Sequence, residues 1–243
     1  MKLTLYCNSL NTKTPLHTQY NQKTLVCGAH FLSPEEQQTC VDNSFCLDNT
    51  GKNISSLNYL LGDLTGLYWI WKNTNDEFVG TNQYRRFYDE KQIDSLLPLK
   101  EDTLYISNYL VCHFNMWEQY IGSHSDMGIK ILSEASRLKR IPITKDMIDR
   151  MYSYKLLSPC NMFFGHRSIF DKVCQVLFEI VFELYNGTRY ALKFIQNGVH
   201  TGRSINDKRL LAFLAERILT ILYLHSDHFF DTMKIVPVNY RTV

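Results

Sequence analysis

The 243-residue sequence has no dense cluster of basic residues and no long apolar segment. Its net charge is +2, and its densest basic run, "RLKR" at 137–140, is typical of a solvated face. A nucleic-acid partner is therefore not expected. No apolar run approaches the roughly 20 residues that span a bilayer, and the first residues lack the apolar core of a secretory signal. We expect a cytoplasmic protein with at most peripheral membrane association.

Several motifs of metal and catalytic chemistry are also missing. The seven cysteines are odd in number and include no CxxC pair, which favours reduced, mostly buried thiols over disulfides or a zinc site. GxSxG, HExxH and the kinase motifs are absent. So is Asp-x-Asp, the motif that holds a divalent metal against a nucleotide diphosphate in many sugar transferases. We predict no metal-ligand residues and no obligatory cofactor, with Mn²⁺ or Mg²⁺ left as the alternative.

Apolar periodicity predicts alternating strands and helices in one domain, residues 1–243. The expected strands lie at 3–7, 77–81, 103–111 and 233–238, the last at a sheet edge because of Pro237. The expected helices lie at 61–73, 115–138, from a capping-box-like start at Ser168 onward, and 207–224. Residues 8–24, 48–58 and 186–206 read as loops. This pattern predicts an α/β sandwich, whose ligands bind at the carboxyl ends of the strands.

An arginine pair follows the strand predicted at 77–81. In "EFVGTNQYRRFYD" Arg85 and Arg86 stand between Tyr84 and Phe87. Guanidinium groups bind phosphate oxygens bidentately and stack on aromatic rings, so the pair suits a diphosphate. A second interpretation fits the local sequence equally well, in which an arginine bonds backbone carbonyls or a carboxylate such as Asp89.

Other polar residues are weaker candidates. "DNTGKNIS" at 48–55 offers carboxylate, hydroxyl and amide groups around Gly51, but a simple Asx-turn loop explains it better. His124 lies two residues before Asp126, a pair suited to base or sugar-binding roles. His225, Asp227 and His228 read as a surface cluster rather than a metal site. The last helix carries acid–base candidates, namely Asp207 and Glu216 with its neighbour Arg217.

Taken together, several strings resemble a bacterial glycosyltransferase family of capsule, exopolysaccharide and O-antigen gene clusters, long carried as a domain of unknown function. The resemblance covers roughly residues 45 to 225, and the order and spacing of its blocks make it specific. The blocks are "DNTGKNIS", Asn58, "DLTGLYWIWKN", "FVGTNQYRRF", "NMWEQYIGSHSDMG", "CNMFFGHRSIFDKVCQVLFEIVFEL" and "DKRLLAFLAERILTILYLH".

The resemblance implies a GT-A-like fold and transfer of a hexose, often galactose or a related sugar, from a nucleotide-diphosphate donor. A UDP-sugar is the favoured donor, and a glycan or lipid-linked molecule in surface polysaccharide synthesis is the expected acceptor. Residues 1–112 are expected to bind mainly the sugar nucleotide. Residues 113–243 are expected to be mainly helical and to face the acceptor.

The resemblance also assigns candidate residues. It places around the sugar donor Asp48, Thr50, Gly51, Asn53, Asn58, Asp63, Tyr68, Trp69 and Gln83, with the two arginines. It places His124, Asp126, Asn161, Glu216 and Arg217 at the reaction centre or acceptor side, with Asp207 as a further candidate base.

Two positions depart from the family pattern. Gln83 replaces the usual His before Tyr-Arg-Arg, and Asp63 replaces Glu. These departures keep a second hypothesis open, that of a degenerate, non-catalytic module that binds a carbohydrate or nucleotide.

Overall fold

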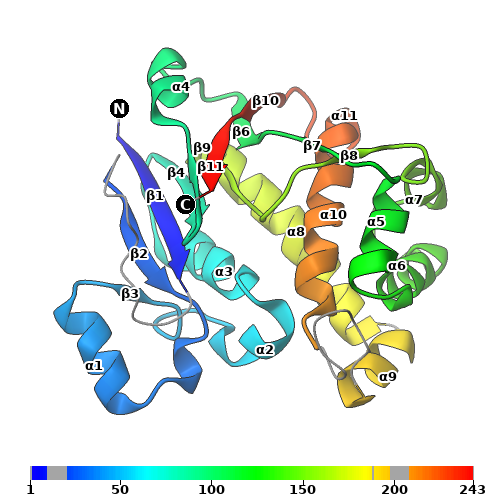
Figure 1. Cartoon of the computed structure of the whole chain (residues 1–243), viewed down its shortest axis with the longest axis horizontal. Helices are drawn as coiled ribbons and strands as arrows, with labels where there is room; N and C mark the ends of the chain where they lie inside the picture. The colour runs from blue at the N-terminus through cyan, green and yellow to red at the C-terminus, as the bar shows by residue number, and fades with distance from the viewer. Residues whose placement is uncertain (1, 10–20, 188, 198–207, 243) are drawn as a thin grey trace. The chain divides into compact units, whose positions relative to one another are not determined.

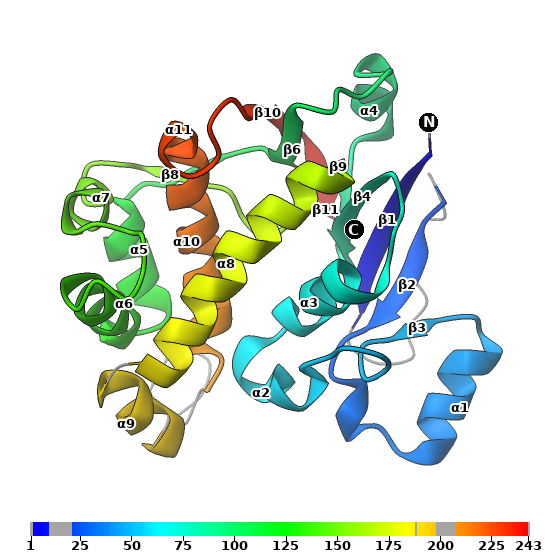
Figure 2. The same ribbon diagram turned by 180° about the vertical axis from the view of Figure 1, so that it is seen from behind.

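The computed structural model describes residues 2–9, 21–187, 189–197 and 208–242 (Figures 1 and 2). These residues fall into two compact units. The first unit contains residues 1–108, 159–174 and 226–243, and the second contains 109–158 and 175–225. The chain leaves the first unit close to the boundary expected at residue 112, but it returns there twice. Asp207 lies outside the described residues.

A mixed sheet forms the centre of the first unit. Its main strand order is β10-β6-β9-β4-β1-β2-β3, and the hairpin strand β5 joins β4 to β11. Along the main order most neighbours are parallel, whereas β9 runs antiparallel between β4 and β6. The strands are β1 (Leu3–Ser9), β2 (Lys23–Val26), β3 (Cys46–Leu47), β4 (Phe78–Gln83), β5 (Arg86–Tyr88), β6 (Thr103–Ser107), β9 (Phe163–His166), β10 (Lys234–Val238) and β11 (Tyr240–Thr242).

Helices and helical turns connect these strands. Helix α1 begins with a complete capping box between Ser33 and Glu36, which satisfies two backbone N–H groups at once. Helix α3 packs against the sheet at Gly66, where an added Cβ would lie 2.5 Å from the sulfur of Cys27. The elements are η1 (Ala29–Phe31), α1 (Pro34–Asp42), η2 (Ser55–Leu57), α2 (Asn58–Leu61), α3 (Leu64–Asn73), α4 (Glu90–Ser95), the start of α8 (Arg167–Gly187) and α11 (Ser226–Phe229).

Buried strands explain why the sheet is stable. All seven residues of β1 are buried, so this central strand is covered on both faces. On one face Tyr105 stacks on Phe164, with ring centroids 4.8 Å apart. Gly80 lets β4 approach β9, because an added Cβ there would lie 2.2 Å from Cβ of Phe164.

The second unit is mainly helical. It contains the short strands β7 (Leu110–Val111) and β8 (Leu156–Leu157), helices α5 (Met116–Ser123), α6 (Met127–Arg137), α7 (Lys145–Arg150), α9 (Arg189–Asn197) and α10 (Leu210–Leu224), and the rest of α8. Buried side chains tie these helices together. The indole of Trp117 donates to the carbonyl of Ile148 at 2.8 Å, and the hydroxyl of Tyr120 donates to that of Leu210 at 3.2 Å.

The structure corrects several expected boundaries. The helix expected over 115–138 is two helices, interrupted at Ser125, whose φ is 129°. The strand expected over 103–111 divides into β6 and β7. Helix α9 occupies most of the described part of the loop expected at 186–206. The expected capping box at Ser168 is wrong, since α8 begins at Arg167 and Asp171 pairs with that arginine at 3.3 Å. The edge position of β10 is confirmed.

All seven cysteines are free, as expected, and five of them are buried. Burial raises the pKa of the Cys7 thiol to about 12 and that of the Cys27 and Cys174 thiols well above the usual range. Thiols with a raised pKa stay protonated at neutral pH and react poorly, because the thiolate is the nucleophile.

We expect iodoacetamide at pH 8 to label the native protein chiefly at the partly exposed Cys46 and Cys112. Mass spectrometry of the labelled peptides measures this. The same reagent in urea should label all seven, which controls for intrinsic reactivity. Rapid labelling of Cys27 in the native protein would contradict the described packing.

Candidate functional site

The parallel strands β1, β2, β3 and β4 end at one edge of the sheet. Asp48 follows β3 directly, and Gln83 is the last residue of β4. Polar residues gather where these strands end, as expected for the ligand-binding edge of an α/β sheet.

Asp48 is a buried hydrogen-bond acceptor that links several segments at this edge. Its side chain is fully buried, and its carboxylate accepts hydrogen bonds from the backbone N–H of Gly28 at 2.8 Å and of Ala29 at 2.9 Å. It also accepts from the hydroxyl of Ser55 and from that of Thr65 at 2.6 Å. Asp48 thus joins the turn after β2 to α3, and any contact with a sugar donor stays a prediction.

The rest of "DNTGKNIS" forms a loop that is bonded to itself and to α3. Thr50 accepts a hydrogen bond from the indole N–H of Trp69 at 2.9 Å. Asn73 accepts from the N–H of Lys52 at 2.9 Å and fills the space beside Gly51, whose φ is 53°. The Asx-type loop interpretation is therefore supported.

Two other residues of the expected donor set also make internal contacts. The Asn53 amide donates to the carbonyls of Asn49 and Gly51, at 3.1 and 3.0 Å. The Asn58 amide donates to Gly62 and Thr65, at 2.8 and 3.0 Å. Tyr68 stays partly exposed on α3.

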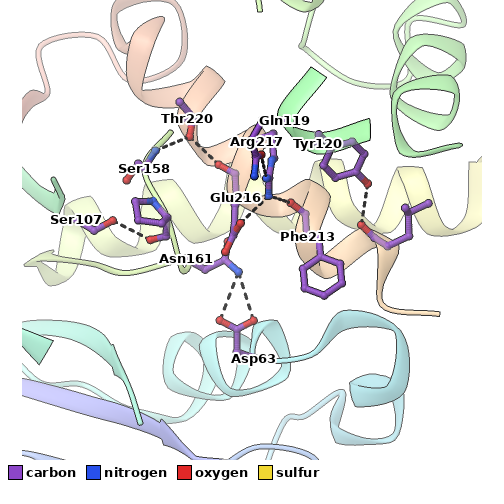
Figure 3. A network of polar contacts seen from close by, with 12 residues as sticks. Asp63, Ser107, Gln119, Tyr120, Ser158, Asn161, Phe213, Glu216, Arg217 and Thr220 are labelled. Carbon is purple, nitrogen blue, oxygen red and sulfur yellow. Dashed lines mark hydrogen bonds and ion pairs between the residues drawn. The ribbon is translucent and has the colours of Figure 1, made fainter. Parts of the chain in front are cut away.

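A carboxylate–amide cluster lies at the end of β4, and Figure 3 shows its contact between Asp63 and Asn161. The amide of Gln83 donates to Asp63 at 2.6 Å and to the carbonyl of Cys160 at 3.0 Å. The amide of Asn161 donates to both carboxylate oxygens of Asp63, at 3.3 and 3.4 Å. The two positions that depart from the family pattern, Asp63 and Gln83, are thus direct partners, and Asn161, expected on the acceptor side, joins them.

Asn161, which belongs to the cluster, lies in the segment before β9 and has an uncommon backbone conformation. Cys160 and Asn161 both have positive φ, 73° and 51°, although neither is glycine. Side chains of the sheet hold the segment: Ser107 donates to the carbonyl of Pro159 at 2.8 Å, and Thr81 to that of Asn161 at 3.2 Å. The amide oxygen of Asn161 is buried and has no hydrogen-bond partner among the described residues.

The arginine pair occupies a hairpin between β4 and β5. Arg85 lies at the exposed turn, where its guanidinium stacks over the ring of Tyr84 at 4.6 Å. Arg86 begins β5 opposite Gln83 and is half-buried. Asp89 caps α4 instead of pairing with an arginine. Among the described residues, no side-chain hydrogen bond or ion pair holds Arg86.

A buried ionic cluster lies on α10 of the second unit (Figure 3). Arg217 is 1% exposed, and it bonds Glu216 at 2.6 Å and the carbonyl of Phe213 at 2.9 Å. It also donates to the side chain of Gln119 on α5. These contacts fix the Glu216 carboxylate in one orientation.

His124 and Asp126 do not form the expected pair. His124 is buried, and its ring stacks on that of Phe213 with centroids 4.0 Å apart. Asp126 is exposed and pairs with Lys130 at 2.7 Å. Their roles in the reaction stay predictions.

Asp227 and His228 lie on α11, and both are exposed, as expected for a surface cluster. No group of three or more His, Cys, Asp or Glu side chains that could hold a metal ion occurs in the described part of the chain. No described helix is long and apolar enough to cross a membrane.

Sequence reasoning missed several partners of these sites, chiefly Ser55, Thr65, Asn73 and Gln119. Thr65 and Asn73 lie within "DLTGLYWIWKN", Thr65 near the start of α3 and Asn73 at its end. Polar residues at both ends of an apolar helix could have indicated that each end bonds to a neighbouring loop. The contact of Gln119 with Arg217 has no local signal.

Comparisons with known proteins agree with this fold. The family model described as "Domain of unknown function (DUF4422)" matches residues 14–227. A solved apo structure of the bifunctional glycosyltransferase WbbM matches with a TM-score of 0.71 and 18% sequence identity. The match covers 100% of this chain and 45% of that one. No curated protein sequence matches. The α/β fold predicted from the sequence is confirmed.

Proposed function

The chain belongs to the family described as Domain of unknown function (DUF4422), and from this premise we propose that it is a glycosyltransferase. Its α/β fold, shared with the solved glycosyltransferase, is compatible with this activity. Since the chain spans only 45% of that protein, the proposal concerns one transfer reaction. The favoured donor is a UDP-hexose of galactose type, and the favoured acceptor is a glycan or lipid-linked molecule of surface polysaccharide synthesis.

The observation that carries this proposal is the Asp63–Gln83–Asn161 cluster at the end of β4. It presents a buried amide oxygen that lacks a partner in the described chain. Buried polar atoms are nearly always hydrogen-bonded, so at a ligand-binding edge this oxygen is suited to accept a hydrogen bond from a polar ligand. A carbonyl-type oxygen accepts hydrogen bonds, and a sugar hydroxyl is a suitable donor.

The orientation of the Asn161 amide follows from its neighbour. Its nitrogen must face the Asp63 carboxylate, because two oxygens facing each other would repel. The amide oxygen then points away from Asp63 and repels phosphate oxygens. The cluster therefore suits the sugar part of a donor.

The diphosphate requires positive charge instead. During transfer, negative charge develops on the departing diphosphate, and groups that stabilise it lower the barrier. Arg86 has no carboxylate partner among the described residues, and Arg85 lies one residue away at the exposed turn. We assign leaving-group stabilisation to this pair.

The acceptor hydroxyl needs a base if the reaction inverts the anomeric centre. Of the described candidates, Glu216 has a side chain 21% exposed and held by Arg217, whereas His124 is 4% exposed. We favour Glu216. Asp207 stays a candidate, as do Asp126 and Arg217 for acceptor contacts.

The side chains of the Asp63 cluster do not form a suitable set of ligands for a bound divalent cation. They offer one carboxylate, and both oxygens already accept hydrogen bonds from amide nitrogens. Cation sites of this kind are usually built from several carboxylates or phosphate oxygens. The proposed reaction therefore uses no Mn²⁺ or Mg²⁺ at this cluster.

The test is nucleoside-diphosphate release from UDP-, GDP- and dTDP-hexoses, with and without Mn²⁺. We expect release from a UDP-hexose, faster when a glycan acceptor is present. Asp63→Asn is the matched variant, because it keeps the shape of the side chain and removes the charge that orients both amides. We expect it to slow release at least tenfold.

The alternative function is a non-catalytic module that binds a sugar nucleotide. The internal bonding of Gln83, which replaces the family's histidine, favours it. If calorimetry shows that UDP binds but none of these sugar nucleotides releases its nucleoside diphosphate, the protein is a binding module and the transferase proposal is wrong.

A further inference from the structure

A cavity of about 640 Å³ lies between α6 and α7 in the second unit. The two helices lie side by side in both views (Figures 1 and 2). Its lining includes the buried side chains of Ile141, Ile143 and Ile148. None of the residues assigned to sugar transfer lines this cavity.

Basic side chains surround the apolar wall. The lining includes Arg137, Lys139 and Lys145, against the single carboxylate of Asp149. Lys145 pairs with Asp149. Arg137 and Lys139 are exposed and have no carboxylate partner in the described chain. The cavity therefore carries an excess of uncompensated positive charge.

The turn between the two helices adds exposed apolar surface. Leu138 is 42% exposed and stands between the two unpaired cations. Lys139 has φ of 53°, and its N–H donates to the carbonyl of Ser136 at 2.9 Å, so α6 ends sharply there. Pro142 is exposed further along the same connection. Apolar side chains flanked by basic ones are typical of surfaces that bind at a membrane interface.

From these observations we propose that the α6–α7 turn and cavity dock on the surface of an acidic phospholipid bilayer. Arg137 and Lys139 bind lipid phosphate groups, with the hydroxyls of Ser133 and Ser136 at the same rim. Leu138 enters the acyl boundary, and the cavity beside it receives part of a lipid chain. Charge complementarity and the adjoining apolar cavity together select a lipid over a free anion.

The test is co-sedimentation of the whole protein with vesicles. We expect binding to mixed phosphatidylglycerol–phosphatidylcholine vesicles and little binding to phosphatidylcholine alone. Arg137→Gln with Lys139→Gln should lower the partition coefficient roughly 30-fold, given the usual contribution of each basic residue near an anionic surface. Added salt should weaken binding, because it screens exposed charges.

Two control arms isolate the site. Lys91→Gln with Lys100→Gln changes the net charge equally on exposed residues outside the cavity, and it should alter binding less than twofold. Leu138→Asn tests the apolar contact and should lower binding roughly tenfold. Thermal melting of each variant confirms that it is folded.

Three results would overturn the proposal. They are equal binding to both kinds of vesicle or to neither, equal loss in the two double charge variants, and no effect of Leu138→Asn. The last result, together with full displacement by inorganic phosphate, would indicate a free-anion site. Vesicle binding requires no sugar transfer, so its outcome is independent of the transferase assay.

Discussion

Arg86→Ala is expected to lower kcat for sugar transfer about 100- to 1000-fold, the range seen when one preorganised group facing developing negative charge is removed. Arg86 begins β5 opposite Gln83, and no described side chain neutralises its guanidinium. Because the diphosphate gains charge mainly in the transition state, kcat should fall more than KM rises. Steady-state kinetics with the donor identified by the release assay measures both.

The matched control is Lys91→Ala. Lys91 is an exposed cation on α4, five residues along the chain, and its removal changes the net charge equally. Its kcat should stay within twofold of the parent protein. Arg86→Lys should lie between the two, because lysine keeps the charge but not the bidentate geometry. Near-normal turnover of Arg86→Ala would remove the arginine from the mechanism.

Asp48→Ala is expected to lower the free energy of unfolding by about 3–5 kcal/mol. The carboxylate is fully buried and accepts from two backbone N–H groups and two hydroxyls. Alanine leaves these donors without an acceptor in a buried place, and the turn at Gly28 loses its link to α3. Urea denaturation at constant pH, followed by the fluorescence of the three tryptophans, measures the loss.

Asp42→Ala serves as the control for this stability measurement. Asp42 ends α1, and its exposed side chain accepts one hydrogen bond from Gln38. Exposed substitutions of this kind usually change stability by less than about 0.5 kcal/mol. If Asp48→Ala cost no more than this control, the buried hydrogen-bond network described around β2 and α3 would be wrong.

Long periodic segments could be predicted from the sequence. The apolar repeats of α3, α8 and α10 gave correct helices, and the alternation at residues 2–7 gave a correct strand, although β1 is buried on both faces and not on one. Helix α1 was missed, although Ser33 and Glu36 carry a readable capping box. Strand β3 has two residues, too few for any periodic signal.

The composition of the site was harder to predict than the fold. Asn161 and Asp63 are 98 positions apart in the chain, and only the antiparallel insertion of β9 brings them together. His124 packs on Phe213 whereas Asp126 pairs with Lys130, because residues two positions apart near a helix end do not face each other. The partners of these polar residues depend on sheet topology and not on their spacing along the chain.

The left-handed conformation at Asn161 also limits which amino acids related sequences can carry there. Only glycine, asparagine and aspartate adopt this conformation readily, and branched residues such as valine or threonine are strongly disfavoured. Glycine would relieve the strain but would lose the amide that meets Asp63, and aspartate would place two carboxylates together. A relative that keeps this site should therefore have asparagine at this position, and one with glycine should have lost the contact while retaining the fold.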